Sequence, residues 1–471
     1  MRPLPGARIH TFAGTTILLL LCGYANVSSN LTVRRGKFMK LTKYRWEVLF
    51  WLFLITLVSY FDRVNFSVAA PVIMKELSID VALMGIIMSG FNIGYTVMNF
   101  AGGVLASKYS ARKYIVLILI CWSIMTVITG FGWSFMSLLV IRIVFGLFEG
   151  PLFVICTKVV KQWMRPVERG RSLGIISSAM SVGIIIGLPL SALVINKFGW
   201  QSIFYIFGAI GILLALLVLW RVKDSPADHP SISSEERKSI EEAIAAADGA
   251  ASATLKGTPS VELLKNPLVW LLCFVYFSYM LFAWANLSWM PTYFMQARGV
   301  SLVKSGFLSA IPYIAGGLGP IILGWLSDKE IIFKYRAGWV TFSIVTLAPL
   351  IVGAVLISSV TGSLMCFAFG TFFALGGNVV MLSLAMGVFD KADVPKVSGF
   401  MMGSGAFAGI LAPSIVGFVV KATNSFNNAY YAFAVLAVIG AVFALILLKK
   451  EKAIKLQRAA AAGMVANGQT A

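Results

Sequence analysis

Long apolar runs separated by short polar loops dominate the sequence. Twelve of these runs approach the ~20 residues that an α-helix needs to cross a bilayer. Their predicted cores are 48–70, 83–106, 114–132, 136–157, 172–195, 202–220, 268–294, 302–327, 338–358, 364–388, 398–420 and 426–448. The pattern therefore predicts an all-α polytopic membrane protein with twelve transmembrane helices.

A polar interruption at 221–267 divides the twelve runs into six and six. Within it, SSEERKSIEEAIAAA begins with a capping-box-like Ser-x-x-Glu pattern, which predicts a short surface helix. The predicted organisation is an N-terminal six-helix bundle (39–220), a linker (221–267), a C-terminal six-helix bundle (268–448) and a tail (449–471). Similar motifs recur in the two halves, as is typical of transporters built from repeats. They are GVLASK at 103–108 and GWLSDK at 324–329, with the pairs Gly183/Gly187 and Gly405/Gly409, which ordinary helix packing would also explain.

Residues 1–38 fit this plan poorly. TTILLLLCGYA looks like a short signal-peptide core, but a twelve-span protein needs no cleaved signal. Met39 precedes KLTKYRWE, a suitable lead-in to the first span. We therefore expect an N-terminal extension that is disordered or not native, with a signal peptide as the alternative.

The composition agrees with a membrane protein, because 59% of the residues are hydrophobic and only 12% are charged. Alternate loops hold 27 Lys and Arg on one side of the membrane and five on the other. By the positive-inside rule, both ends and the linker are cytoplasmic, and the expected location is the cell inner membrane. The net charge of +20 is then a topology signal, so we expect no nucleic-acid partner.

Four charges fall inside predicted spans: Asp62 and Arg63 on helix one, and Arg142 and Glu149 on helix four. Each such charge costs about 2.5–3.5 kcal/mol on insertion, so it is a functional candidate by default. The alternative is a structural ion pair that fixes helix one against helix four. One pair would suffice for that purpose, and there are two.

Neighbouring residues on a helix point about 100° apart, so Asp62 and Arg63 do not satisfy each other. Arg142 and Glu149 share a face but lie roughly 10 Å apart along the axis. The simplest arrangement pairs Asp62 with Arg142 and leaves Glu149 and Arg63 without fixed partners. A buried acid of this kind can load and release a proton, and a free arginine can bind a carboxylate in bidentate fashion. We therefore expect a proton-coupled carrier of an organic anion.

With these residues, the chain resembles the major facilitator superfamily and, within it, the anion:cation symporter family. The resemblance covers 39–450 and rests on YFDRVNFSVAAP (60–71), RIVFGLFEGP (142–151), WMPTYF (289–294) and PVERGRS (166–172), with the two loop motifs. It implies alternating access by two rocking halves. It also implies that Asp62 and Glu149 couple protons, that Arg142 is their partner base, and that Arg63 and Tyr95 line the substrate site, with Tyr60 as a further contact.

The chain departs from that family at several positions. Ser107 and Ser110 replace an acid and a glycine of the first loop motif, so the lock between helices there is expected to differ. Met180 and Gly403 stand where sugar-acid carriers often have polar residues, which favours a less polar carboxylate. Asn286, Asn378, Ser404 and Ser178 are the polar groups that could compensate, and Trp284 and Trp289 are candidate aromatic walls.

The leading hypothesis is proton-coupled import of a small organic carboxylate, either a sugar acid or an aromatic or aliphatic acid. The partners would be the substrate, protons and the lipid bilayer, and a monomer is expected. A proton-driven antiporter or exporter of the same fold is the alternative, and a non-transporting receptor is a lesser one. The five cysteines and two histidines show no metal-ligand spacing, and no phosphate-binding loop occurs. We therefore expect no enzyme, no metal and no cofactor.

Overall fold

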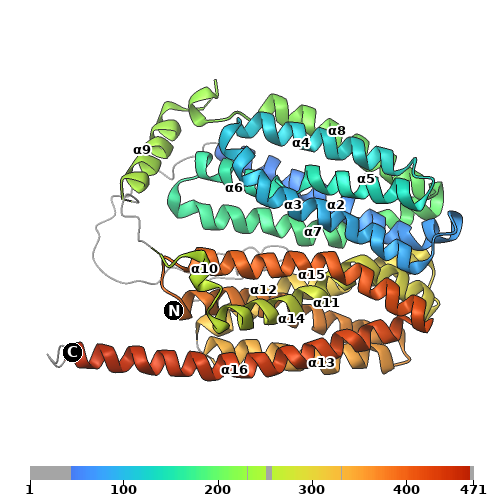
Figure 1. Ribbon diagram of the computed structural model, residues 1–471. Coiled ribbons are helices and arrows are strands. Elements are labelled where there is room, and N and C mark those ends of the chain that lie inside the picture. Colours follow the sequence, from blue (N-terminus) through green and yellow to red (C-terminus); the bar gives the residue numbers. More distant parts are fainter. Residues whose placement is uncertain (1–43, 231, 251–256, 330, 467–471) are drawn as a thin grey trace, which may run out of the picture. The chain divides into compact units, whose positions relative to one another are not determined.

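The apolar runs form long α-helices in the computed structural model, which describes residues 44–230, 232–250, 257–329 and 331–466 (Figure 1). The predicted extension at 1–38 lies outside these residues. Before the linker come α2 (Tyr44–Glu76), α3 (Val81–Lys108), α4 (Ala111–Thr129), α5 (Phe135–Glu149), α6 (Leu152–Trp163), α7 (Pro166–Phe198) and α8 (Trp200–Arg221). The linker holds α9 (Ser234–Ala250) and α10 (Ser260–Leu263). After it come α11 (Pro267–Arg298), α12 (Leu302–Asp328), α13 (Arg336–Leu356), α14 (Val360–Val388), α15 (Val394–Thr423) and α16 (Phe426–Ala466).

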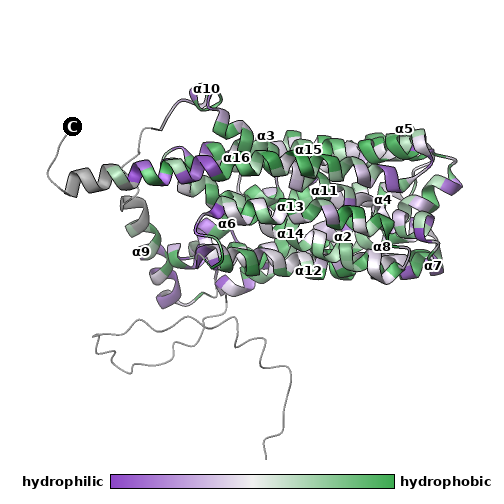
Figure 2. Cartoon of the chain, turned by 90° about the horizontal axis from the view of Figure 1, so that it is seen from below, coloured by the Kyte–Doolittle hydropathy of each residue, from purple (hydrophilic) through white to green (hydrophobic). Residues whose placement is uncertain are grey.

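Eleven helical stretches of the described chain are long and apolar enough to cross a membrane, with α5 and α6 counted as one. The twelfth long helix is α2, which has 33 residues and carries Asp62 and Arg63 in its sequence. Figure 2 shows hydrophobic residues along most of these helices and hydrophilic residues gathered near their ends. The twelve-helix membrane fold predicted from the sequence is therefore present. The predicted surface helix of the linker is also present, as α9.

The two groups of helices repeat one packing pattern. Before the linker, α2 packs on α7, α3 on α5, and α4 on α8. After the linker, the equivalent contacts are α11 on α15, α12 on α14, and α13 on α16. We call these groups the N-terminal half (α2–α8) and the C-terminal half (α11–α16).

One predicted span is not a single helix. The run at 136–157 is divided into α5 and α6, with Gly150 capping α5 and Pro151 preceding α6. Pro151 has no backbone N–H to donate to the preceding turn, which favours a break at this point. As a result, Glu149 is the last residue of α5.

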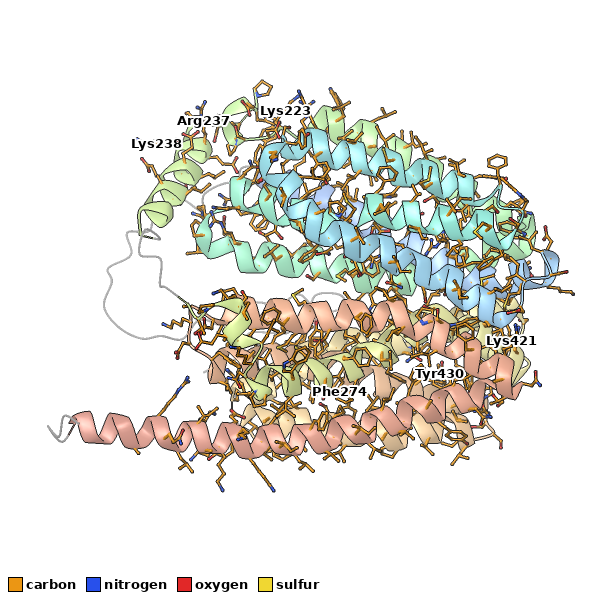
Figure 3. The ribbon with its side chains drawn as sticks, viewed as in Figure 1. Lys223, Arg237, Lys238, Phe274, Lys421 and Tyr430 are labelled. Carbon is orange, nitrogen blue, oxygen red and sulfur yellow. The ribbon has the colours of Figure 1, made fainter. Side chains whose placement is uncertain are left out.

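The linker contacts both halves at the end of the bundle that holds α9 and α10, which we call the linker end. The His229 ring lies 4.2 Å from the ring of Tyr44 and 6.2 Å from that of Trp163, centroid to centroid, in the N-terminal half. The Thr258 backbone N–H and hydroxyl donate to the two carboxylate oxygens of Asp393 at 2.7 Å, in the C-terminal half. Figure 3 labels Lys223, Arg237 and Lys238 at this end and Lys421 at the opposite one, which we call the far end.

The two halves are joined directly at the far end. Lys421 of α15 donates to Asp80, the N-cap of α3, at 2.9 Å, and the hydroxyls of Ser89 and Ser414 lie 2.8 Å apart. Within the described residues, these are the direct hydrogen bonds and ion pairs between the halves. A Cβ at Gly85 of α3 would lie 2.6 Å from the Pro413 carbonyl oxygen, so only glycine permits this approach of α3 to α15. The structure is therefore closed at the far end.

Candidate functional site

A small cavity lies where the N-terminal half meets α11. Its volume is about 30 Å³, room for about one water, and its polar lining is Arg63, Ser67, Asn92, Arg142 and Ser288. Its apolar lining is Phe66, Met88, Phe91, Trp284 and Leu287. Arg63 thus faces the space between the halves, as the sequence predicts. Arg142 faces the same space, which the sequence analysis does not predict.

Arg63 forms an ion pair with Glu149, a pairing that differs from our expectation. The Arg63 Nε donates to Glu149 Oε1 at 2.6 Å, and the Ser59 hydroxyl donates to the same oxygen at 2.6 Å. Ser59 precedes Arg63 by four residues and therefore shares its face of α2. The expectation that Arg63 and Glu149 lack fixed partners is wrong. The other oxygen of Glu149, Oε2, is buried and accepts no hydrogen bond from the described residues.

Asp62 is the acid without a partner. It is 1% exposed, and neither of its carboxylate oxygens accepts a hydrogen bond within the part of the chain that the structure describes. Thr126 and Trp122 of α4 face this carboxylate, but neither donates with ordinary geometry. The predicted ion pair between Asp62 and Arg142 does not form. Because Arg63 turns towards α5, the next residue back on the helix turns towards α4 instead.

Aromatic rings surround Arg142 on three sides. Its guanidinium carbon lies 4.6 Å from the ring of Phe66, 5.0 Å from Phe91 and 4.9 Å from Phe145. It makes no hydrogen bond or ion pair with any described residue, and its Nε is buried. Cation–π contacts stabilise a desolvated cation by about 2 kcal/mol or more, which offsets part of the cost of burial. An anion in the cavity would supply the missing hydrogen-bond acceptor.

Tyr60 and Tyr95 lie beside Arg63, but neither lines the cavity. Each tyrosine ring centroid is 4.6 Å from the Arg63 guanidinium carbon. Tyr95 comes from α3, which approaches α5 closely because Gly146 has no Cβ. A Cβ at this position would lie 2.1 Å from the Phe91 carbonyl oxygen. This glycine holds the aromatic face of α3 against both arginines.

Three other predicted substrate residues lie away from the cavity lining. Asn286 accepts a hydrogen bond from the Tyr430 hydroxyl at 3.2 Å, which ties α11 to α16. The Trp289 indole donates to the Pro413 carbonyl oxygen at 3.0 Å, and its ring is fully buried. The Asn378 amide contacts the Met280 sulfur at 3.7 Å. The structure does not bring these three residues to Arg63.

Sequence reasoning missed Ser59 and Asn92. Ser59 had a usable signal, because a hydroxyl four residues before an intramembrane arginine lies on the same face. Asn92 also had one, since it is a polar residue three positions before Tyr95 in an apolar run. Ser67 and Ser288 had none, because serine is common in transmembrane helices.

Comparison with known proteins places the chain in a family. The family model described as "Major Facilitator Superfamily" matches residues 52–376. The hexuronate transporter of Bacillus subtilis (strain 168) is 31% identical over 405 residues, covering 84% of this chain and 93% of that protein. A protein of Cupriavidus necator named "Probable sulfoacetate transporter SauU" is 32% identical over 407 residues, covering 83% and 91%.

A solved structure shows the same fold. It is that of a bacterial homologue of the human lysosomal transporter Spinster, in an inward-facing, unoccupied conformation. The TM-score is 0.71 at 19% identity, and the match covers 88% of this chain and 98% of that one. The twelve helices, the repeated halves and these matches agree: the chain is a multi-pass membrane protein that belongs to the Major Facilitator Superfamily.

Proposed function

We propose that this protein imports a small organic carboxylate together with protons, by alternating access of the cavity to the two sides of the membrane. The observation that carries the proposal is the pair of arginines at one cavity between the halves, one of which has no acidic partner among the described residues. Two guanidinium groups beside a small apolar-walled space favour an organic anion over a cation or a neutral molecule. The names of the two relatives contain the words hexuronate and sulfoacetate, which both denote organic anions.

Proton movement and substrate binding are coupled because Glu149 and the substrate carboxylate both bind Arg63. Glu149 occupies the Arg63 Nε, so a substrate carboxylate that binds Arg63 competes with Glu149 for the same cation. A proton on Glu149 removes that competing charge and frees the guanidinium for bidentate binding of the substrate. Proton loading and anion loading therefore favour each other.

Asp62 supplies a second proton site. A buried carboxylate without a hydrogen-bond donor is costly when charged, and protonation removes that cost. Asp62 also lies within electrostatic reach of Glu149 and Arg142. We propose that Asp62 and Glu149 form the proton path, with Arg142 setting the potential between them.

The proposed orientation places the linker end in the cytoplasm. The loops at this end, with both ends of the bundle, hold 27 of the Lys and Arg residues, against five at the far end. This asymmetry satisfies the positive-inside rule for an inner membrane. Closure at the far end then corresponds to a conformation closed to the outside.

Uptake into right-side-out membrane vesicles tests the proposal. With hexuronate as the first probe and an acidic outside, wild-type vesicles should accumulate substrate. Glu149→Gln and Asp62→Asn should each abolish accumulation, because neither variant can release a proton at that position. Exchange of internal for external substrate needs no net proton movement, and we expect it to persist in Glu149→Gln.

The matched control is Glu241→Gln on α9, which alters a surface ion pair with Arg237. This variant makes the same chemical change outside the membrane and should transport like wild type. Proton-driven accumulation that survives unimpaired in both Glu149→Gln and Asp62→Asn would contradict the proposed coupling.

A further inference from the structure

A much larger groove lies on the C-terminal half, apart from the central cavity. It has a volume of about 1130 Å³ and is formed by α11, α15 and α16. Its walls are largely aromatic and include Phe274, Phe277, Phe407 and Phe443. Phe274, labelled in Figure 3, meets Phe443 edge to face, with ring centroids 4.7 Å apart. The Phe407 side chain is 54% exposed, so this aromatic surface is open rather than sealed by protein.

The groove has the depth of one leaflet. Along α11 its lining runs from Asn266 to Phe277, which is about 17 Å of helix at 1.5 Å per residue. Half of a ~30 Å hydrocarbon core is about 15 Å. Trp270 lies at the groove mouth, 59% exposed, with its indole N–H donating to the Leu264 carbonyl oxygen at 2.7 Å. An exposed tryptophan of this kind is typical of the membrane–water interface.

Polar residues gather at the linker end of the groove, and their charge is positive. Lys450 and Gln457 of α16 line the mouth, with Asn266 of α11 opposite. Lys450 is exposed and forms no ion pair with any residue that the structure describes. Lys449 and Lys265 are exposed next to these lining residues.

Two acids lie near the same mouth. Glu451 is 2% exposed and is occupied, because it accepts the Ala337 backbone N–H at 2.8 Å and pairs with Lys455 at 3.2 Å. Glu262 of α10 is exposed, and its charge offsets that of one of the three lysines. The balance at the mouth remains positive, so it complements a negatively charged head group.

We propose that this groove binds one anionic phospholipid of the leaflet at the linker end, with an acyl chain against the phenylalanines and the phosphate at Lys450. Length favours a lipid chain over a soluble ligand, because the groove runs along α11 for about the thickness of one leaflet. Charge favours an anionic head group over a zwitterionic one, since basic pockets between transmembrane helices bind anionic lipids.

Native mass spectrometry of the purified, delipidated protein tests this site. Phosphatidylglycerol and phosphatidylcholine with identical acyl chains are added in parallel. Wild type should retain phosphatidylglycerol preferentially, and only that lipid should raise the apparent Tm. Lys450→Gln should reduce the preference about fivefold, the factor expected for one basic residue near an anionic lipid.

Lys452→Gln is the matched control, because it removes the same charge two positions along α16, on the opposite side of the helix. It should keep the preference. Ala453→Trp fills the groove and should lower retention of both lipids. Equal retention of the two lipids by wild type, or an unchanged preference in Lys450→Gln, would overturn the proposal. Neither readout depends on transport, so the lipid site and the transport function can fail separately.

Discussion

Arg63 and Arg142 differ in what neutralises them, although both face one cavity. A carboxylate neutralises Arg63, whereas Arg142 lies against aromatic rings and forms no ion pair with any described residue. Aromatic rings attract a cation but accept no strong hydrogen bond, so the guanidinium N–H groups of Arg142 can still donate to an acceptor. At the scale of single residues, Arg142 is therefore the cation most available to an arriving anion, and Arg63 becomes available only when Glu149 is neutral.

Replacing Arg142 by lysine tests this difference. Arg142→Lys keeps the charge but loses the planar group that stacks on Phe66 and Phe145 and offers paired N–H donors. We expect the Kd for hexuronate, or for whichever organic acid binds tightest, to rise about tenfold, as loss of 1–2 kcal/mol implies. Isothermal titration of the purified protein measures this change.

Arg171→Lys serves as the control for Arg142→Lys. Arg171 also stacks on an aromatic ring, with its guanidinium carbon 5.6 Å from the Trp46 ring, but it lies at the linker end. Its substitution should leave the Kd unchanged. An unaltered Kd in Arg142→Lys would show that stacking and fork geometry do not matter at the cavity.

At the scale of elements, close helix contacts at glycines determine which side chains lie together. Gly146 lets α5 approach the α3 backbone, and Gly183 lets α7 approach α2, where a Cβ would lie 2.9 Å from the Leu57 carbonyl oxygen. These contacts fix the rotation of α2 and α5 about their axes. The sequence shows that charged residues on helices one and four must find partners, but it does not show this rotation.

This explains which predictions succeed. Apolar length and the linker predict the helices and their two halves, because the bilayer imposes helix length. Asp62, Arg63, Arg142 and Glu149 stand out in the sequence because burying charge is costly, and their roles in transport stay predictions. Their pairing depends on how α2 and α5 are rotated about their own axes, which the glycine contacts set and which the periodicity of an apolar helix does not reveal. For that reason the pairing was predicted wrongly.

Gly146→Ala tests the role of close packing. A Cβ 2.1 Å from the Phe91 carbonyl oxygen must push α5 away from α3, and overpacking of this kind costs about 1–3 kcal/mol. We expect a lower apparent Tm and weaker substrate binding, since Phe91 contacts both arginines. Gly103→Ala on α3 is the control, because a Cβ there meets no atom within 4 Å.

The control substitution should change the Tm in the opposite direction. Alanine is favoured over glycine within a helix by about 0.5–1 kcal/mol, so Gly103→Ala should hold or raise the Tm. Thermal unfolding in detergent compares the two variants. A Gly146→Ala protein as stable as wild type would mean that α3 and α5 tolerate a wider spacing than the structure shows.

At the scale of the whole molecule, alternating access requires the contacts at the far end to break. The described hydrogen bonds and ion pairs that join the halves directly are one serine pair and one exposed ion pair, Asp80–Lys421. An exposed ion pair is worth about 0–1 kcal/mol. The far end is thus held by contacts weak enough to exchange, together with the close packing of α3 against α15.

The Asp80–Lys421 pair gives the closed far end a defined pH dependence. The Leu83 backbone N–H, followed by Lys421, lowers the pKa of Asp80 below its usual value. Only the Lys421 part of this lowering depends on closure, because Asp80 and Leu83 belong to the same helix N-terminus. That part stabilises the closed form at every pH above about 4, the usual pKa of an aspartate, and is lost as pH falls through the lowered pKa. We expect the closed population to stay constant between about pH 5 and 8 and to decrease below about pH 4.

The closed population can be measured from the distance between spin labels at positions 75 and 422, by double electron–electron resonance. Lys421→Gln should reduce it by no more than about fivefold at neutral pH and remove the part of the acid response that depends on the pair. A change between pH 5 and 8 that persists in Lys421→Gln would assign the pH response to the buried carboxylates instead.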